Sequence, residues 1–275
     1  MSNRGDLDVM YVYDGSFIGF LCCVFESYHC GEMPQDIVPD DMPRGFLYPV
    51  KQIITDHEKA KRVYVSLTHK IKQTAVNWLK VAFLAGVEGK ELTMFHFIRL
   101  GYQIGPPVVT MLTHGTVHAV YQMVRAVQHE SRQFFGFIRF AEYQQTLVSI
   151  IEPKHFVLPL IQKHFCHRYP DEQFLIYDQT HAMVLVYDSK QANIMPLDKI
   201  KLPETHGPEQ KYQSLWQQYY KIIAIEARLN PQCRRSHMPK RFWRHITELE
   251  KEILTSQLAV PPATTHQVKQ LKCNT

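Results

Sequence analysis

Hydrophobic residues recur every three or four positions over much of the first half of the chain, the spacing of helices that bury one face. Leu79, Ala82 and Phe83 are an example. Asp56, a good helix-capping residue, precedes the first of these segments. We therefore predict a helical subdomain over residues 56–131. Its expected helices run from Asp56 through Leu67 and over Gln73–Leu84, Glu91–Tyr102 and Val117–Glu130.

A strand, a turn and a helix are expected before this subdomain. Met10–Tyr13 is a short β-prone run that ends at Asp14-Gly15-Ser16, and Phe17–Phe25 follows with helical spacing. This unit is typical of the edge of an α/β layer. Residues 31–49 then contain four prolines. Because proline forbids a regular helix, this stretch predicts a long connection.

The pattern changes to β-type alternation in the second half of the chain. The run Gly136–Phe140 alternates in polarity, and Leu158–Arg168 has helical spacing. Further β-rich runs are Thr146–Ile151, Phe174–Tyr177 and Met183–Tyr187. Residues 134–200 thus form a predicted β-rich part. The fold class that we expect is α+β, with a small and mostly antiparallel sheet.

Two basic helices are expected over residues 208–254. Tyr212–Leu229 has a strong amphipathic pattern that ends at Asn230-Pro231, and a last helix is expected from Pro239 to about Leu254. The residues of the first helix that are spaced for burial are Leu215, Tyr219, Ile222, Ile223 and Ile225. We expect residues 1–255 to form a single α+β domain, followed by a flexible tail over residues 256–275.

Composition narrows the class of protein. Of the 275 residues, 45% are apolar, which argues against an intrinsically disordered chain. The longest near-candidate for a membrane span, Phe17–Phe25, is far too short, and no signal-peptide pattern opens the sequence. We expect a cytoplasmic protein with no membrane partner. Its six cysteines are expected to be free thiols: Cys22, Cys23, Cys30, Cys166, Cys233 and Cys273.

Positive charge is concentrated near the C-terminus. The net charge is +5, and residues 211–251 hold nine basic and three acidic side chains, so the rest of the chain is close to neutral. This asymmetry favours a polyanionic partner, although a solvated helix face would have the same pattern. The sharpest basic cluster contains Arg234, Arg235, Lys240, Arg241 and Arg244.

This basic cluster has the residue types of a phosphate-binding site. The break at Asn230-Pro231 predicts that Arg234 and Arg235 lie on a loop, which leads into the helix that carries the remaining three cations. The free amides and dipole of a helix N-terminus add to cationic side chains in binding phosphate. A purely structural basic corner is the alternative. Arg168 and Arg139 are weaker candidates, and Arg139 is expected to face away from the apolar side of its strand, between Phe137 and Phe140.

Carboxylates offer a second kind of site. Asp14, Glu130 and Glu152 are candidate acid–base residues for an enzyme that acts directly on DNA. Asp14 lies where a strand meets a helix, a position that suits function, but it could equally cap the helix. Glu130 could instead form an ion pair with Arg132 that fixes a junction.

Signatures of common enzyme classes are missing. The sequence has no phosphate-binding P-loop, no dinucleotide-binding glycine pattern and no Gly-x-Ser-x-Gly elbow. It has no Cys-x-x-Cys pair. Two histidine pairs, His114/His118 and His164/His167, have spacings that could suit a metal, but each lacks an evident third ligand. We therefore expect no metal and no cofactor.

Several short motifs in collinear order resemble the family labelled probable DNA metabolism protein. The resemblance extends over nearly the whole chain to about Leu249. It rests on Tyr13-Asp14-Gly15-Ser16-Phe17, Cys22–Tyr28, Thr55-Asp56, Gly136–Phe140, Leu158-Pro159-Leu160, His164-Phe165, Ile176-Tyr177-Asp178, Leu215-Trp216, Asn230-Pro231 and Met238–Trp243. Members of that family of unknown function lie beside, or are fused to, radical SAM proteins or uracil-DNA-glycosylase-like domains. The resemblance implies a bacterial role in DNA repair or modification with such a partner. In the family pattern a His-Arg pair tends to precede the Gly-Phe-x-Arg-Phe run, whereas Arg132-Gln133 stand there in this chain.

Three functional hypotheses follow. The leading one is a DNA-binding accessory protein that positions DNA for a partner enzyme, and it predicts that an Arg235→Ala, Arg241→Ala double variant loses salt-sensitive DNA binding. The alternative is a hydrolase or glycosylase that uses the acidic residues. A third is a protein-interaction module whose basic face meets an acidic partner.

Overall fold

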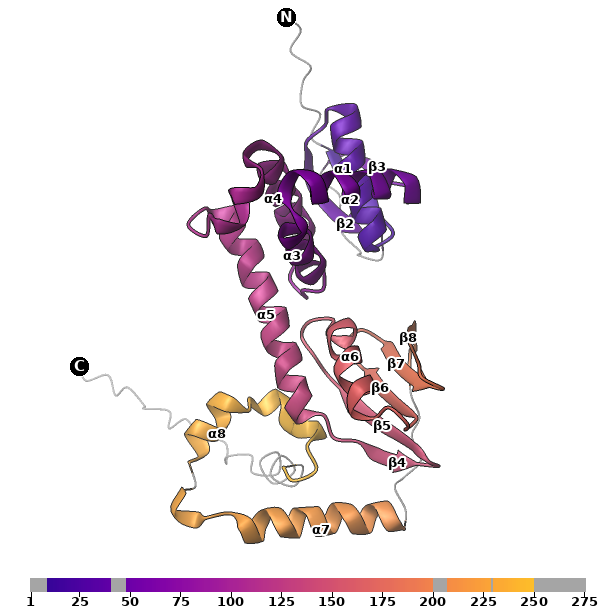
Figure 1. Ribbon diagram of the computed structural model, residues 1–275, viewed down its shortest axis with the longest axis vertical. Coiled ribbons are helices and arrows are strands. Elements are labelled where there is room, and N and C mark those ends of the chain that lie inside the picture. Colours follow the sequence, from indigo (N-terminus) through magenta and orange to yellow (C-terminus); the bar gives the residue numbers. More distant parts are fainter. Residues whose placement is uncertain (1–8, 41–47, 200–206, 229, 250–275) are drawn as a thin grey trace, which may run out of the picture.

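The computed structural model describes residues 9–40, 48–199, 207–228 and 230–249. These residues pack into two main hydrophobic cores that are joined by one long helix, α5 (Gly115–Phe137) (Figure 1). The first core comprises residues from Val9 to Val127, and the second comprises residues from Phe134 to Leu249. In the part of the chain so described, no helix combines the length and apolar character that crossing a bilayer requires.

A three-stranded parallel sheet lies in the first core. Its strands are β1 (Val9–Tyr13), β2 (Pro34–Pro39) and β3 (Val50–Gln52), in the order β2-β1-β3. All five residues of β1 are buried, as expected of the central strand of a parallel sheet. The expected strand at Met10–Tyr13 is confirmed. The proline-rich stretch was predicted as a connection, but it contains β2, in which prolines occupy the two ends.

Four helices and one 3₁₀ turn complete the first core. They are α1 (Phe17–Cys30), α2 (His57–Ile71), α3 (Gln73–Phe83), α4 (Lys90–Ile104) and η1 (Pro106–Thr110). The expected helices are confirmed. The Asp56 side chain accepts hydrogen bonds from the amides of Glu58 and Lys59, so the predicted cap of α2 is also confirmed.

The helix α5 is longer at its C-terminal end than predicted. It ends at Phe137, so the expected strand over Gly136–Phe140 is wrong. Val127, Phe134 and Ile138 recur at helical spacing and are all buried, and burial of this continuing stripe outweighs the two-residue alternation of the short run. Arg139 consequently lies just beyond a helix end and not on a strand.

The second core contains a five-stranded sheet in the order β4-β5-β6-β7-β8. The strands are β4 (Ala141–Tyr143), β5 (Thr146–Ile151), β6 (Phe174–Asp178), β7 (Met183–Asp188) and β8 (Gln191–Pro196). Three of the four pairings are antiparallel, and β5 and β6 run parallel, connected through α6 (Leu158–Arg168). The α+β class and the mostly antiparallel sheet are therefore confirmed, while β8 was not foreseen.

The C-terminal elements differ most from expectation. They are α7 (Pro208–Ile223), η2 (Glu226–Arg228), α8 (Pro231–His237) and η3 (Lys240–His245). The residues of and after α7 that were expected to be buried are 50–81% exposed. The amphipathic pattern identified an apolar face, but such a pattern contains no information on whether another element covers it.

The basic cluster is also arranged differently. Arg234 and Arg235 lie in α8 and not on a loop, and Asn230 caps this short helix by accepting from the Cys233 amide. The expected last helix is a single 3₁₀ segment, η3, within the described residues. The predicted extension to Leu254 and the predicted tail over 256–275 lie outside the residues that the structure describes.

Candidate nucleic-acid interface

Two aromatic side chains anchor the basic segment, which we define as residues 231–245. Phe242 and Trp243 are only 5% and 6% exposed. The Phe242 ring packs against Phe134 and Phe137, with centroids 5.1 Å apart in each case. The Trp243 indole donates to the Met238 carbonyl oxygen at 2.8 Å. The backbone that carries the cations is thereby fixed to the second core and to the end of α5.

Arg241 is paired with one of the candidate catalytic acids. Its guanidinium lies 3.1 Å from Oε1 of Glu130, a residue of α5 that is 2% exposed. The same carboxylate accepts hydrogen bonds from the backbone amides of Lys154 and His155, at 3.1 and 2.8 Å. Both oxygens of Glu130 are buried and hydrogen-bonded, so the carboxylate holds α5, the segment after β5 and η3 together.

Arg244 is paired with another candidate acid. Its guanidinium lies 3.0 Å from Oε1 of Glu152, and Nε2 of His245 lies 3.1 Å from the same oxygen. The Arg244 side chain is 68% exposed, so most of its N–H donors face solvent. Glu152 therefore orients a guanidinium that remains accessible.

Arg139 is bonded to the end of α5 and to a carboxylate that follows η3. It donates to the Gly136 carbonyl oxygen at 2.8 Å, beside the C-terminal end of α5, and to Oε1 of Glu248 at 2.8 Å. The Trp216 indole donates to the other oxygen of Glu248 at 3.1 Å. Burial opposes ionisation of Glu248, but these partners outweigh it and lower the pKa of its carboxyl. Through its bond from Trp216, Glu248 connects α7 to Arg139 and the second core.

A polar groove runs between β4, β5 and the basic segment. It has a volume of about 250 Å³. Arg139, Arg244 and His245 line it together with Ser149, Gln213 and Thr247. Two of the sequence-predicted cations, Arg139 and Arg244, thus meet at one groove, a convergence that their distance in the sequence did not reveal.

The other predicted cations are not among the described residues that line this groove. Arg234 stacks on the Trp243 ring at 4.7 Å, and Arg235 is exposed with its Nε donating to the Pro231 carbonyl oxygen. Lys240 is exposed at the start of η3. Arg168 stacks on its neighbour Tyr169 at the end of α6 and is not among the described residues that line the groove.

Asp14 is exposed just after β1, a strand of the first core, whereas Glu130 and Glu152 both contact the basic segment. The Asp14 carboxylate accepts from the Ser16 amide and hydroxyl and, at 2.7 Å, from the Thr55 hydroxyl. Burial opposes ionisation, but the bonds from Thr55 and Ser16 prevail and lower the pKa of Asp14. The side chain closes the turn between β1 and α1, while Ser16 caps the helix through the Gly19 amide.

His155 is a site residue that the sequence did not indicate. It is 5% exposed, and its Nδ1 accepts from the Gly86 amide at 3.0 Å, so it links the second core to the segment between α3 and α4. Burial lowers the pKa of this imidazole. No sequence motif marks this residue, because its partners are 25 and 69 positions away.

The two histidine pairs have different surroundings. His118 contacts Gln122 on the exposed side of α5, and His164 stacks on Phe135 with centroids 4.3 Å apart. Among the residues that the structure describes, no three His, Cys, Asp or Glu side chains are grouped as metal ligands. The five cysteines in those ranges are free thiols, as expected, and Cys273 lies outside them.

The chain is therefore an α+β protein in which a basic segment packs on the second of two cores and is held there in part by the carboxylates of Glu130 and Glu152. The chain belongs to the DUF4130 family, a domain of unknown function, whose model matches residues 88–248. The matched region begins just before α4 and includes the whole basic segment. The expected membership in a family of unknown function is thereby confirmed. No curated protein matches the chain.

Proposed function

We propose that this protein is a DNA-binding accessory protein that acts in the bacterial cytoplasm with a partner enzyme of DNA repair or modification. The observation that carries the proposal is the set of exposed cations on α8 and η3, whose backbone is anchored by the buried Phe242 and Trp243, with Arg244 at a polar groove. Exposed guanidinium and ammonium groups on an anchored backbone suit contacts with the DNA backbone. The resemblance of the sequence supports a radical SAM or uracil-DNA-glycosylase-like partner.

The ion pairs in the segment are compatible with phosphate contact. A guanidinium has five N–H donors, and Arg244 uses one nitrogen on Glu152 while its side chain stays largely exposed. Lys240 and Arg235 add exposed positive charge on the same segment. Arg241 contributes less, because it neutralises the buried Glu130 carboxylate. We therefore assign phosphate contact chiefly to Arg235, Lys240 and Arg244.

The arrangement gives less support to the enzyme alternative. Glu130 is buried with both oxygens occupied, and one oxygen of Glu152 contacts both Arg244 and His245. Asp14 is exposed and bonds to Ser16 and Thr55, at the edge of the other core. The three acids therefore do not form one site, and we do not extend the proposal to catalysis by them.

The test is a fluorescence-anisotropy titration of the full chain against single-stranded, duplex and uracil-containing DNA at several salt concentrations. We expect affinity to fall steeply with salt, because phosphate contacts release counterions. A Lys240→Ala, Arg244→Ala variant is expected to bind about tenfold more weakly and to have a shallower salt slope. The matched control, Lys61→Ala, Arg125→Ala, removes two exposed charges on α2 and α5 and should bind like the parent protein.

Two results would overturn the proposal. One is equal DNA affinity of the Lys240→Ala, Arg244→Ala variant and the parent protein. The other is an absence of DNA binding even at low salt, which would instead favour an interaction module with an acidic protein partner.

A further inference from the structure

The first core contains a pocket of about 440 Å³ between α1, α2 and α4, separate from the basic segment. This volume lies within the range of small-molecule sites, roughly 300–1,000 Å³. The described residues that line the pocket are Val24, Phe25, Tyr28, His29, Arg62, Val63, Ser66, Lys70 and Tyr102. Aliphatic side chains, aromatic rings and cations therefore surround one cavity, and none of these residues is acidic.

Aromatic rings form part of its walls. Tyr28 and Tyr102 meet edge to face with centroids 5.5 Å apart, and Tyr28 is 47% exposed. Phe25 stacks on His29 at 5.7 Å with an interplanar angle of 18°. An exposed tyrosine ring at the mouth of a pocket offers a flat face on which a planar group can stack.

Cations lie over these rings. Arg62 lies 5.3 Å from the Phe25 centroid, and Lys70 lies 5.6 Å from that of Tyr102. Arg99 lies 5.2 Å from the centroid of Tyr28, next to the pocket. Within the described ranges, none of the three has an ion pair with a carboxylate, unlike Arg241 and Arg244 of the basic segment. Their positive charge is therefore available to an anion.

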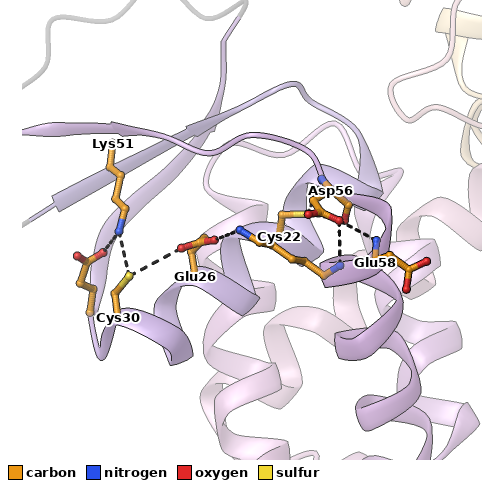
Figure 2. A network of polar contacts seen from close by, with 8 residues as sticks. Cys22, Glu26, Cys30, Lys51, Asp56 and Glu58 are labelled. Carbon is orange, nitrogen blue, oxygen red and sulfur yellow. Dashed lines mark hydrogen bonds and ion pairs between the residues drawn. The ribbon is translucent and has the colours of Figure 1, made fainter.

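Acidic side chains near the pocket are neutralised by other lysines. Figure 2 shows the network along α1, in which Lys59 of α2 lies 2.6 Å from Oε1 of Glu26. Lys51 of β3 contacts Glu32 at 2.7 Å and the Cys30 sulfur at 3.3 Å. These contacts hold α1 against β3 and α2, and so fix two of the three walls of the pocket. They also leave Arg62 and Lys70 free of carboxylate partners.

We propose that this pocket binds a nucleotide, with the base stacked on Tyr28 and the phosphate held by Arg62 and Lys70. A nucleotide combines the two groups for which the pocket has complementary side chains, a planar base and an anionic phosphate. The source is either a free mononucleotide or an unpaired nucleotide of a DNA strand. The proposal does not depend on the role of the basic segment, because it rests on a different core.

The test is isothermal titration calorimetry of the full chain with a deoxynucleoside monophosphate, with the matching deoxynucleoside and with inorganic phosphate at one ionic strength. We expect the monophosphate to bind at least about tenfold more tightly than either half alone, because stacking and charge attraction both contribute. A short single-stranded oligonucleotide is titrated in parallel. Tighter binding of the oligonucleotide, displaced by the monophosphate, assigns the pocket to DNA; tighter binding of the monophosphate assigns it to the free nucleotide.

Two matched pairs of variants test the assignment of roles. Tyr28→Ala is expected to weaken binding about tenfold, while Tyr28→Phe keeps the ring and the affinity. Arg62→Gln is expected to weaken binding similarly, whereas Lys61→Gln, an exposed neighbour outside the pocket lining, should not. Far-UV circular dichroism checks that each variant is folded. The Lys240→Ala, Arg244→Ala variant should keep full nucleotide affinity, which separates this proposal from that of the basic segment.

The proposal is overturned if neither the monophosphate nor the oligonucleotide binds. It is also overturned if the folded Tyr28→Ala and Arg62→Gln variants bind the monophosphate as the parent protein does.

Discussion

Replacing Glu130 by alanine is expected to destabilise the protein strongly. The substitution removes the acceptor of the Lys154 and His155 amides, of which the His155 bond is buried. A buried donor left without a partner costs about 1–3 kcal/mol. The Lys154 bond is only part-buried, so the two amides together cost about 2–5 kcal/mol rather than the full sum. Arg241 adds less than about 1 kcal/mol, because its side chain is 45% exposed and can be hydrated after the loss of its partner.

Two further variants separate the contributions to this effect. Arg241→Ala leaves both amide bonds of Glu130 intact but removes the counter-charge of a buried carboxylate, so it should cost about 1–3 kcal/mol, less than Glu130→Ala. Glu130→Gln keeps one carbonyl acceptor but turns an NH₂ group toward the second amide, so its cost should lie between those of the two alanine variants.

Urea unfolding, followed by tryptophan fluorescence and far-UV circular dichroism, measures these differences. Stability changes shift the unfolding midpoint, while an unchanged slope indicates that the exposed surface is the same. If the free energy of unfolding of Glu130→Ala lies within about 0.5 kcal/mol of that of the parent protein, the structural role of Glu130 is refuted. A Glu130→Gln variant with parent stability but without an activity on DNA that the parent has would instead identify Glu130 as a catalytic acid.

Three other predictions concern the wider fold. Burial lowers the pKa of His155, so the free energy of unfolding should fall as the pH drops below about 6.5, where the unfolded state binds an additional proton. Unfolding of a His155→Asn variant should show a smaller loss of stability between about pH 7 and pH 5. The control variant His118→Asn, at an exposed position, should show the same loss as the parent protein. Gly19→Ala should cost about 1–3 kcal/mol of stability in a thermal melt, because the new Cβ would clash with the side chains that close the turn after β1. In the control variant Gly136→Ala the new Cβ has no neighbouring atom within contact distance, so this change should be neutral or slightly stabilising. Ile222→Ser should change the unfolding free energy by less than about 0.5 kcal/mol, because that side chain is 81% exposed; a larger loss would mean that α7 is covered.

Local sequence signals predicted the first core well. The helix cap at Asp56 and the stripe of apolar residues along α5 depend on contacts within a few positions, whereas the cap of α1 is Ser16 and not Asp14. The β-strand over Gly136–Phe140 was wrong because five residues of alternation compete with a helix that is already under way. The burial of α7 was wrong because a periodic pattern says which face is apolar and not what lies opposite.

The candidate site shows a different limit of sequence reasoning. The cations and the acids were both identified, but as rival hypotheses, because their ion pairs join residues about a hundred positions apart, as in Arg241–Glu130 and Arg244–Glu152. Charge counts along the chain cannot reveal such pairs. The pocket of the first core was missed for a similar reason, since Tyr28, Arg62 and Tyr102 come from three separate helices.

The position of Glu130 explains how the two cores are related. It lies on α5, the helix that connects them, and its bond to the His155 amide fixes the residue whose imidazole accepts from Gly86 in the first core. The same carboxylate pairs with Arg241 of the basic segment. A single buried acid therefore links α5, the first core and the cationic surface. Its loss should disturb the placement of the basic segment as well as global stability, so a weaker DNA affinity of Glu130→Ala is expected even though the carboxylate itself repels phosphate.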